Sequence, residues 1–144
     1  MGGYTAIIQA KRYHDISCGH RVYNHESKCA HLHGHNYRIH FALAAPELDS
    51  IGRVLDFSVI KSRLCMWLED HWDHHCLIWE NDPWLPALLE IDPTVVVVPF
   101  NPTAENMGLY LLRVVAPSAL EGTGCELTEV TVEETRKCSA TCSL

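Results

Sequence analysis

The chain lacks the long apolar segments and the glycine-rich motifs that would place it in several large classes of protein. It contains no run of roughly 18 apolar residues, so we expect no membrane-spanning helix. No basic stretch followed by an apolar one opens the sequence, so we expect no secretory signal and a cytoplasmic location. A nucleotide-binding glycine motif is also absent, and neither a nicotinamide nor a flavin cofactor is expected.

Basic side chains are scarce as well. The chain has 11 Lys and Arg against 18 Asp and Glu, and its formal net charge is -7. Because nucleic-acid-binding proteins usually carry an excess of Lys and Arg, this balance argues against general nucleic-acid binding. It is compatible with a small anionic substrate that is bound by a local group of cations.

The composition otherwise fits one enzyme-sized domain. A length of 144 residues and a hydrophobic content of 47% predict a single domain over 1–144 with its own core. Seven cysteines, an odd number, fit free thiols in a reducing compartment better than a disulfide framework. Ten histidines are many for this length, and seven of them lie between His14 and His40.

Hydrophobic periodicity predicts an α+β fold with four strands and two helices. The expected strands are Tyr4 to about Ser17, His33 to Ala45, Val95 to Val98 and Glu126 to Glu134. The first helix, of about 15 residues, follows the N-cap residue Asp56, and the second begins at its N-cap Thr103 and is closed by Pro117. This order is typical of an antiparallel sheet covered by two helices on one face.

The remaining segments are expected to be irregular. They are a polar loop from Cys18 to Leu32, a turn from Pro46 to Arg53, an irregular stretch from Trp72 to Pro93, and a small, polar tail from Thr135 to Leu144.

The segment from Lys28 to Tyr37, K-C-A-H-L-H-G-H-N-Y, predicts a metal site. Alternate residues of a strand point to the same side, so His33 and His35 project together. They supply two of the three protein ligands that a catalytic zinc site typically has. His20, at the loop end of the first strand, is the best third ligand, and His14 is second. Surface histidines are the alternative, which Cys29, His20 and Gly34 disfavour; copper or iron also fits the ligand types.

Cys29 has three possible interpretations, of which a buried structural thiol is the usual one for a cytosolic cysteine. It lies in a polar loop, where nearby cations or a metal would raise its thiolate fraction and allow it to act as a general base. It could instead be a fourth ligand, which would close the zinc site as a structural one.

Two other groups carry candidate chemistry. The Asp73 carboxylate beside His74 can set the tautomer of the imidazole and stabilise its charged form, although Trp72 and His75 could simply finish a helix. Glu134 shares a strand face with Val130 and Val132, and a buried carboxylate there needs partners, such as the N–H groups of a ligand. The alternative, slightly favoured by parity alone, is a frayed strand end with Glu134 in water.

Together these pieces resemble one family, the 6-pyruvoyl-tetrahydropterin synthases and 6-carboxy-tetrahydropterin synthases. The resemblance covers nearly the whole chain. It rests on C-G-H-R at 18–21, K-C-A-H-L-H-G-H-N-Y at 28–37, L-D-F at 55–57, D-H-H at 73–75, N-P-T-A-E at 101–105 and V-E-E-T at 132–135. It implies the tunnelling fold (T-fold), in which antiparallel four-stranded sheets from several subunits form a barrel. It also implies a homo-oligomer, a hexamer built as a dimer of trimers, with active sites at subunit interfaces.

The resemblance also implies a role for nine positions. The ligands of a Zn²⁺ cofactor would be His20, His33 and His35. The catalytic residues would be Cys29 together with Asp73 and His74 from a neighbouring subunit. The pterin-binding residues would be Glu134, which anchors the ring, and Thr103 and Glu105, which belong to a motif near the pocket.

The spacing between Cys29 and His33 resembles that of the bacterial 6-carboxy-tetrahydropterin synthases of queuosine biosynthesis. This implies a zinc-dependent lyase that converts 7,8-dihydroneopterin triphosphate to 6-carboxy-5,6,7,8-tetrahydropterin, with loss of triphosphate and acetaldehyde. The alternatives are a 6-pyruvoyl-tetrahydropterin synthase and a zinc-stabilised binding module without catalysis. Cations expected at the metal end to hold the triphosphate are Lys11, Arg12, Arg21, Lys28 and Arg38.

Overall fold

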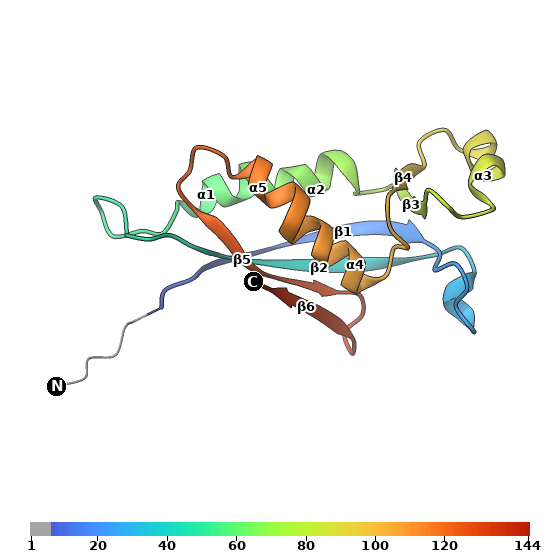
Figure 1. Ribbon diagram of the computed structural model, residues 1–144, viewed down its shortest axis with the longest axis horizontal. Helices are drawn as coiled ribbons and strands as arrows, with labels where there is room; N and C mark the ends of the chain where they lie inside the picture. The colour runs from blue at the N-terminus through green and yellow to red at the C-terminus, as the bar shows by residue number, and fades with distance from the viewer. Residues whose placement is uncertain (1–6) are drawn as a thin grey trace.

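The computed structural model describes residues 7–144, which form a curled six-stranded sheet with two long helical segments (Figure 1). The strands are β1 (Ala10–His20), β2 (His33–Ala44), β3 (Cys76–Trp79), β4 (Val96–Val98), β5 (Glu126–Glu133) and β6 (Ser139–Ser143). Their order across the sheet is β4-β3-β1-β2-β5-β6. The pairs among β1, β2, β5 and β6 are antiparallel, whereas β3 pairs with β1, and β4 with β3, in parallel.

The α+β class is confirmed, but the prediction of four antiparallel strands is wrong. β3 lies within the stretch expected to be irregular, because a short apolar run carries no period that identifies a strand. β6 lies within the expected polar tail, where Ala140 and Cys142 provide an inward face too small to stand out. Of the first predicted strand, residues 4–6 lie outside the described part, and β1 starts at Ala10 and runs on to His20.

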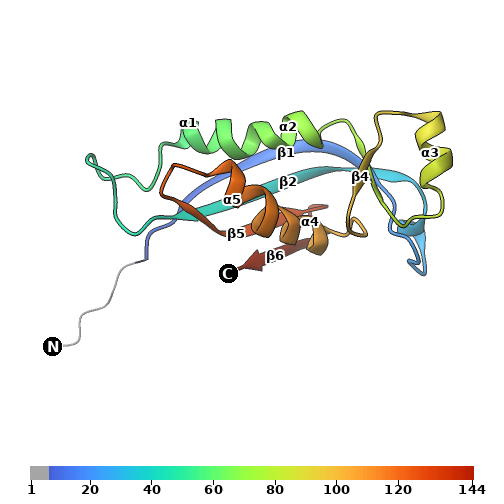
Figure 2. The same cartoon turned by 45° about the horizontal axis from the view of Figure 1, so that its top comes forward.

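Two helical segments lie over one face of the sheet (Figure 2). The first consists of α1 (Phe57–Ile60), a π-helical turn (Lys61–Cys65) and α2 (Met66–His71), and the second of α4 (Ala104–Tyr110), a π-helical turn (Leu111–Val115) and α5 (Ala116–Ala119). A separate short helix, α3 (Leu85–Ile91), joins β3 to β4, and a 3-10 turn (Lys28–Ala30) lies between β1 and β2. Among residues 7–144, no helix has the length and apolar character needed to cross a membrane.

The helix boundaries agree with the sequence at the N-caps but not at Pro117. The Asp56 carboxylate accepts a hydrogen bond from the Ser58 N–H, and the Thr103 hydroxyl accepts one from the Asn106 N–H, so both caps are confirmed. The prediction that Pro117 closes the second helix is wrong, because the helix continues to Ala119. Pro117 is the second residue of α5, which continues directly from the π-helical turn and ends two residues after the proline.

The two faces of the sheet differ in character. We call the side under the helices the covered face; its strand residues Tyr37, Ile39, Phe41, Val130 and Val132 are at most 1% exposed. The other side, which we call the open face, carries Tyr13, Asp15, Arg38 and His40, with Tyr13 51% exposed. Because alternate residues change faces, the register of β1 against β2 decides which site residues meet under the helices.

Candidate active site

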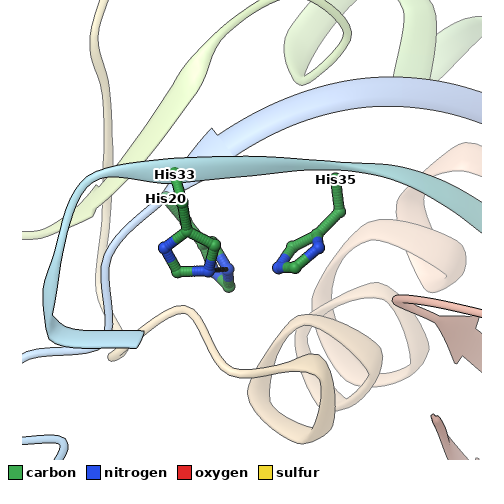
Figure 3. Close-up of side chains that lie close together, drawn as sticks. All are labelled: His20, His33 and His35. Carbon is green, nitrogen blue, oxygen red and sulfur yellow. Dashed lines mark hydrogen bonds between the residues drawn. The ribbon is translucent and has the colours of Figure 1, made fainter. Parts of the chain in front are cut away.

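Three histidines meet at one end of the covered face. His20 in β1 lies directly opposite His33 in β2, and His35 follows two residues later on the same side. One nitrogen from each ring lies within 4.8 Å of the other two (Figure 3). His14, the second candidate, lies elsewhere and contacts Glu69 with Nε2 and Oε1 2.7 Å apart.

Two backbone carbonyls fix the orientation of the first two rings. His20 Nδ1 donates to the Pro102 carbonyl at 2.6 Å, and His33 Nδ1 donates to the His31 carbonyl at 2.7 Å. A carbonyl can only accept, so each neutral ring carries its proton on Nδ1 and leaves Nε2 with a lone pair. The two Nε2 atoms are 3.0 Å apart, so their lone pairs face each other, an arrangement that a bound cation would stabilise.

The third ring and the burial of the group also fit a metal. His35 Nε2 is buried and has no hydrogen-bond partner among the described residues. Burial lowers the pKa of His20 to about 4 and also lowers the pKa of His35, against the opposing charge of Glu134. Both rings are therefore neutral near pH 7, which is the form that binds metals. The three-His group could hold a metal ion.

The cysteines near this group are not part of it. The set of converging ligand atoms contains three histidine nitrogens and neither Cys18 nor Cys29. Cys18 is 3% exposed, and burial raises the pKa of its thiol to about 12, so it stays protonated. Three histidine nitrogens without a cysteine match the protein ligand set of catalytic zinc sites more closely than that of structural ones, which have four protein ligands.

Glu134 lies just beyond β5 and points into the covered face. Its Oε1 is 3.6 Å from His20 Nε2 and 3.7 Å from His35 Nε2, and it accepts a hydrogen bond from the Tyr37 hydroxyl at 3.4 Å. Its side chain is 24% exposed, so the placement in water that parity alone slightly favoured is wrong. Burial raises the pKa of Tyr37, and the Glu134 carboxylate raises it further, so the phenol remains a donor.

Cys29 lies in the 3-10 turn between β1 and β2. The turn has no buried residue, and Cys29 itself is half-buried. Its carbonyl accepts a hydrogen bond from the Val22 N–H at 2.7 Å, two residues after His20. This contact places the cysteine segment alongside the end of β1.

Asp73 and His74 lie on the other side of the sheet. Asp73 Oδ2 and His74 Nδ1 are 2.7 Å apart, and the His74 side chain is 80% exposed. With Ser17, Asn36 and Arg38 of the open face, they line a cavity of about 630 Å³. His74 has a φ of 59°, an uncommon value for a residue with a side chain, and its N–H donates to the Ser17 carbonyl at 2.7 Å. Within one chain, the pair and the three-His group therefore do not form one site.

The N-P-T-A-E motif connects the site to α4. The Asn101 side chain accepts from the Tyr23 N–H at 3.0 Å and donates to the Tyr23 carbonyl at 2.9 Å, while the Pro102 carbonyl orients His20. Thr103 caps α4, and Glu105 in its first turn is exposed. Sequence reasoning missed the carbonyls of Pro102 and His31 and the hydroxyl of Tyr37. Only the motif itself and the parity of Tyr37 with the histidines could have indicated them.

The predicted grouping of five cations at the metal end is wrong. Lys11 and Arg12 pair with Ala42 and Phe41, at the opposite end of β1 from His20. Arg21 is buried and bonded to Asp82. The other two lie apart from each other. Arg38 lines the cavity beside His74, and Lys28 lies in the 3-10 turn, immediately before Cys29.

Known proteins match this chain over nearly its full length. The family model described as 6-pyruvoyl tetrahydropterin synthase matches residues 9–143. A Rickettsia bellii protein named 6-carboxy-5,6,7,8-tetrahydropterin synthase is 31% identical over 134 residues, covering 92% of this chain and 97% of that protein.

Solved structures agree with this match. An uncharacterized protein from Wolinella succinogenes has a TM-score of 0.85 at 25% identity, covering 96% of this chain and 99% of that one. The 6-pyruvoyl tetrahydropterin synthase of Caenorhabditis elegans has a TM-score of 0.68 at 25% identity, covering 96% of each chain. The resemblance drawn from the sequence motifs is thus confirmed, and the chain belongs to the 6-pyruvoyl tetrahydropterin synthase family.

Proposed function

We propose that this protein is a zinc-dependent lyase. It would convert 7,8-dihydroneopterin triphosphate and one water molecule to 6-carboxy-5,6,7,8-tetrahydropterin, triphosphate and acetaldehyde, a step of queuosine biosynthesis. The observation that carries the proposal is the convergence of His20, His33 and His35, two of them with Nδ1 bound to carbonyls, beside the Glu134 carboxylate. The Rickettsia bellii relative, whose name states this product, supports it.

In this proposal the three histidines hold Zn²⁺. When bound there, zinc would act as a Lewis acid that makes hydroxyl groups, and the carbon beside them, easier to deprotonate. Glu134 accepts hydrogen bonds from the N–H groups of the pterin ring and fixes its register. Its carboxylate can accept further hydrogen bonds, because among the described residues only Tyr37 donates one to it.

Proton transfer is assigned to two groups. Cys29 as thiolate removes a side-chain proton of the substrate. His74, held by Asp73, relays a proton on the opposite side of the substrate, and a neighbouring subunit supplies this pair. Asp73 is suited to hold His74: burial alone would raise its pKa, but hydrogen bonds from the Ser17 N–H and from His74 leave it lowered and charged. In the proposal, Thr103 and Glu105 belong to a motif near the pterin pocket.

The test is product identification with zinc-loaded protein. Purified protein is incubated with 7,8-dihydroneopterin triphosphate, and products are identified by mass spectrometry. We expect 6-carboxy-5,6,7,8-tetrahydropterin and acetaldehyde, and loss of both after a chelator removes the metal. A 6-pyruvoyl product would instead support the second candidate, which the description of the matching family favours.

The role of Cys29 is tested separately from the metal. We expect Cys29→Ala to abolish turnover while zinc content, measured by mass spectrometry of the metal, stays at the wild-type value. Cys138→Ala, which removes an exposed thiol on the β5–β6 hairpin, is the matched control and should leave both unchanged. Loss of zinc and of the folded state in Cys29→Ala would favour the zinc-stabilised binding module.

A further inference from the structure

A buried ion pair lies directly after the first histidine of the site. Arg21 Nε and Nη2 donate to the two oxygens of Asp82 at 2.6 and 2.8 Å, and the two side chains are 5% and 0% exposed. The Trp84 ring lies 3.5 Å from Arg21 Cζ, and the Trp84 N–H donates to Asp82 Oδ1 at 2.8 Å. Burial alone would raise the pKa of Asp82, but the bonds from Arg21 and Trp84 leave it lowered, so the pair is charged.

The remaining end of the guanidinium reaches the cysteine segment. Arg21 Nη1 donates to the Ala30 carbonyl at 3.0 Å, and Ala30 follows Cys29. Val22, the residue after Arg21, donates its N–H to the Cys29 carbonyl at 2.7 Å. Two consecutive carbonyls of this segment are thus bound by two consecutive residues that follow His20.

These two bonds matter because little else holds the segment. The 3-10 turn from Lys28 to Ala30 buries no residue, and its N-cap Ser27 makes no capping hydrogen bond through its side chain. A turn in which no residue is fully buried depends strongly on its hydrogen bonds for its position. Asp82 and Trp84 fix the orientation of the planar guanidinium group of Arg21, so its Nη1 can point in only one direction.

We propose that Arg21 is a positioning residue, which acts through the Ala30 carbonyl to hold Cys29 in place beside the three-His group, with Asp82 fixing the guanidinium. The proposal rests on the catalytic role of Cys29 proposed above. A lysine cannot replace Arg21, because an ammonium cannot bond both Asp82 oxygens and the Ala30 carbonyl in this planar geometry.

The test combines hydrogen exchange with steady-state kinetics on the zinc-loaded protein. The variants are Arg21→Lys and the isosteric Asp82→Asn, and the control is Arg53→Lys, which changes an exposed Arg paired with Asp49 and Asp56. In both variants we expect the Val22 amide to exchange about tenfold faster or more, while the Val130 and Val132 amides in the core of β5 stay unchanged. Turnover should fall about tenfold with KM within about twofold of wild type, and zinc content should not change. Arg53→Lys should match wild type throughout.

Three outcomes would overturn the proposal. One is wild-type exchange and kcat in both variants. Another is faster exchange at Val130 and Val132 as well, or loss of zinc, since either would make the pair a general stabiliser of the fold. The third is that neither variant folds; if only Arg21→Lys fails to fold, Asp82→Asn decides. Absence of turnover in the wild type would reject the proposed function alone, because the exchange experiment does not depend on it.

Discussion

Two neighbouring glutamates, Glu133 and Glu134, point to opposite faces of the sheet and therefore have different partners. Glu133 is the last residue of β5, and its Oε2 lies 3.0 Å from Nε2 of His40 on the open face. Glu134 points to the covered face, where it lies near His20 and His35. Their sequence environments are almost identical, and only parity separates them. The carboxylate beside the three-His group therefore follows from the strand period and not from any special residue.

Glu134→Gln should weaken substrate binding. An amide keeps the shape of the carboxylate but loses its charge, and hydrogen bonds to charged groups contribute about 1.5–3 kcal/mol, so KM should rise roughly tenfold to a hundredfold. Zinc content should be unchanged. The matched control is Glu126→Gln, the same charge change on an exposed residue at the start of β5. Steady-state kinetics and metal analysis are applied to both variants. An unaltered KM in Glu134→Gln would show that Glu134 does not anchor the substrate.

At the same scale, sequence could indicate side chains but not backbone partners. His33 and His35 follow from strand parity, and His20 from its place near the loop. The carbonyls of Pro102 and His31 that orient two of these rings carry no residue signature, because every residue has a carbonyl. The Arg21–Asp82 pair joins positions 61 residues apart, a contact that no local pattern encodes.

At the scale of elements, the N-caps were predictable and the edge strand was not. Asp56 and Thr103 are polar residues placed immediately before apolar periodicity, a local signal that the structure confirms. β6 is recognisable only in the fold, since its inward residues Ala140 and Cys142 gain their burial from α4 and β5. The burial that identifies these two residues comes from segments distant in sequence, so the local sequence does not reveal it.

Thr103→Ala should lower the free energy of unfolding by about 1 kcal/mol, the usual cost of losing an N-cap. The lost bond is that from the Asn106 N–H to the Thr103 hydroxyl, 3.1 Å long. Thr103→Ser retains the hydroxyl and should remain close to wild type. Urea unfolding measures both variants, and equal stability of the alanine and serine variants would show that the cap contributes nothing.

The packing of α4 on β6 offers a second prediction. Gly108 is buried in α4, and a Cβ added there would lie 2.8 Å from Cys142 Sγ. Gly108→Ala should therefore destabilise the protein by about 1–3 kcal/mol, the usual cost of overpacking. Cys142→Ala removes the clashing sulfur, so the double variant should recover most of the loss. A double-mutant cycle in urea tests this, and strictly additive effects would contradict a direct clash.

At the scale of the whole molecule, the groups of the proposed site divide between two faces of the sheet. The three-His group and Glu134 lie on the covered face, while Asp73 and His74 line a cavity with Ser17, Asn36 and Arg38 of the open face. Among the described residues, Asp73 is the only hydrogen-bond partner of the His74 ring. One sheet cannot bring its two faces together, so a site that uses both groups requires a second copy of the chain.

Mixed oligomers should therefore recover activity that neither variant has alone. Cys29→Ala keeps an intact Asp73–His74 pair, and His74→Ala keeps an intact Cys29, so a site built across two subunits can take one good half from each. Random co-assembly should restore about a quarter of the wild-type activity in co-expressed, co-purified protein. Asp73→Ala mixed with His74→Ala is the matched control and should stay inactive, because both changes damage the half that the same subunit provides. If Cys29→Ala and His74→Ala co-assemble with full zinc content and still show no turnover, then the two groups do not act in one shared site.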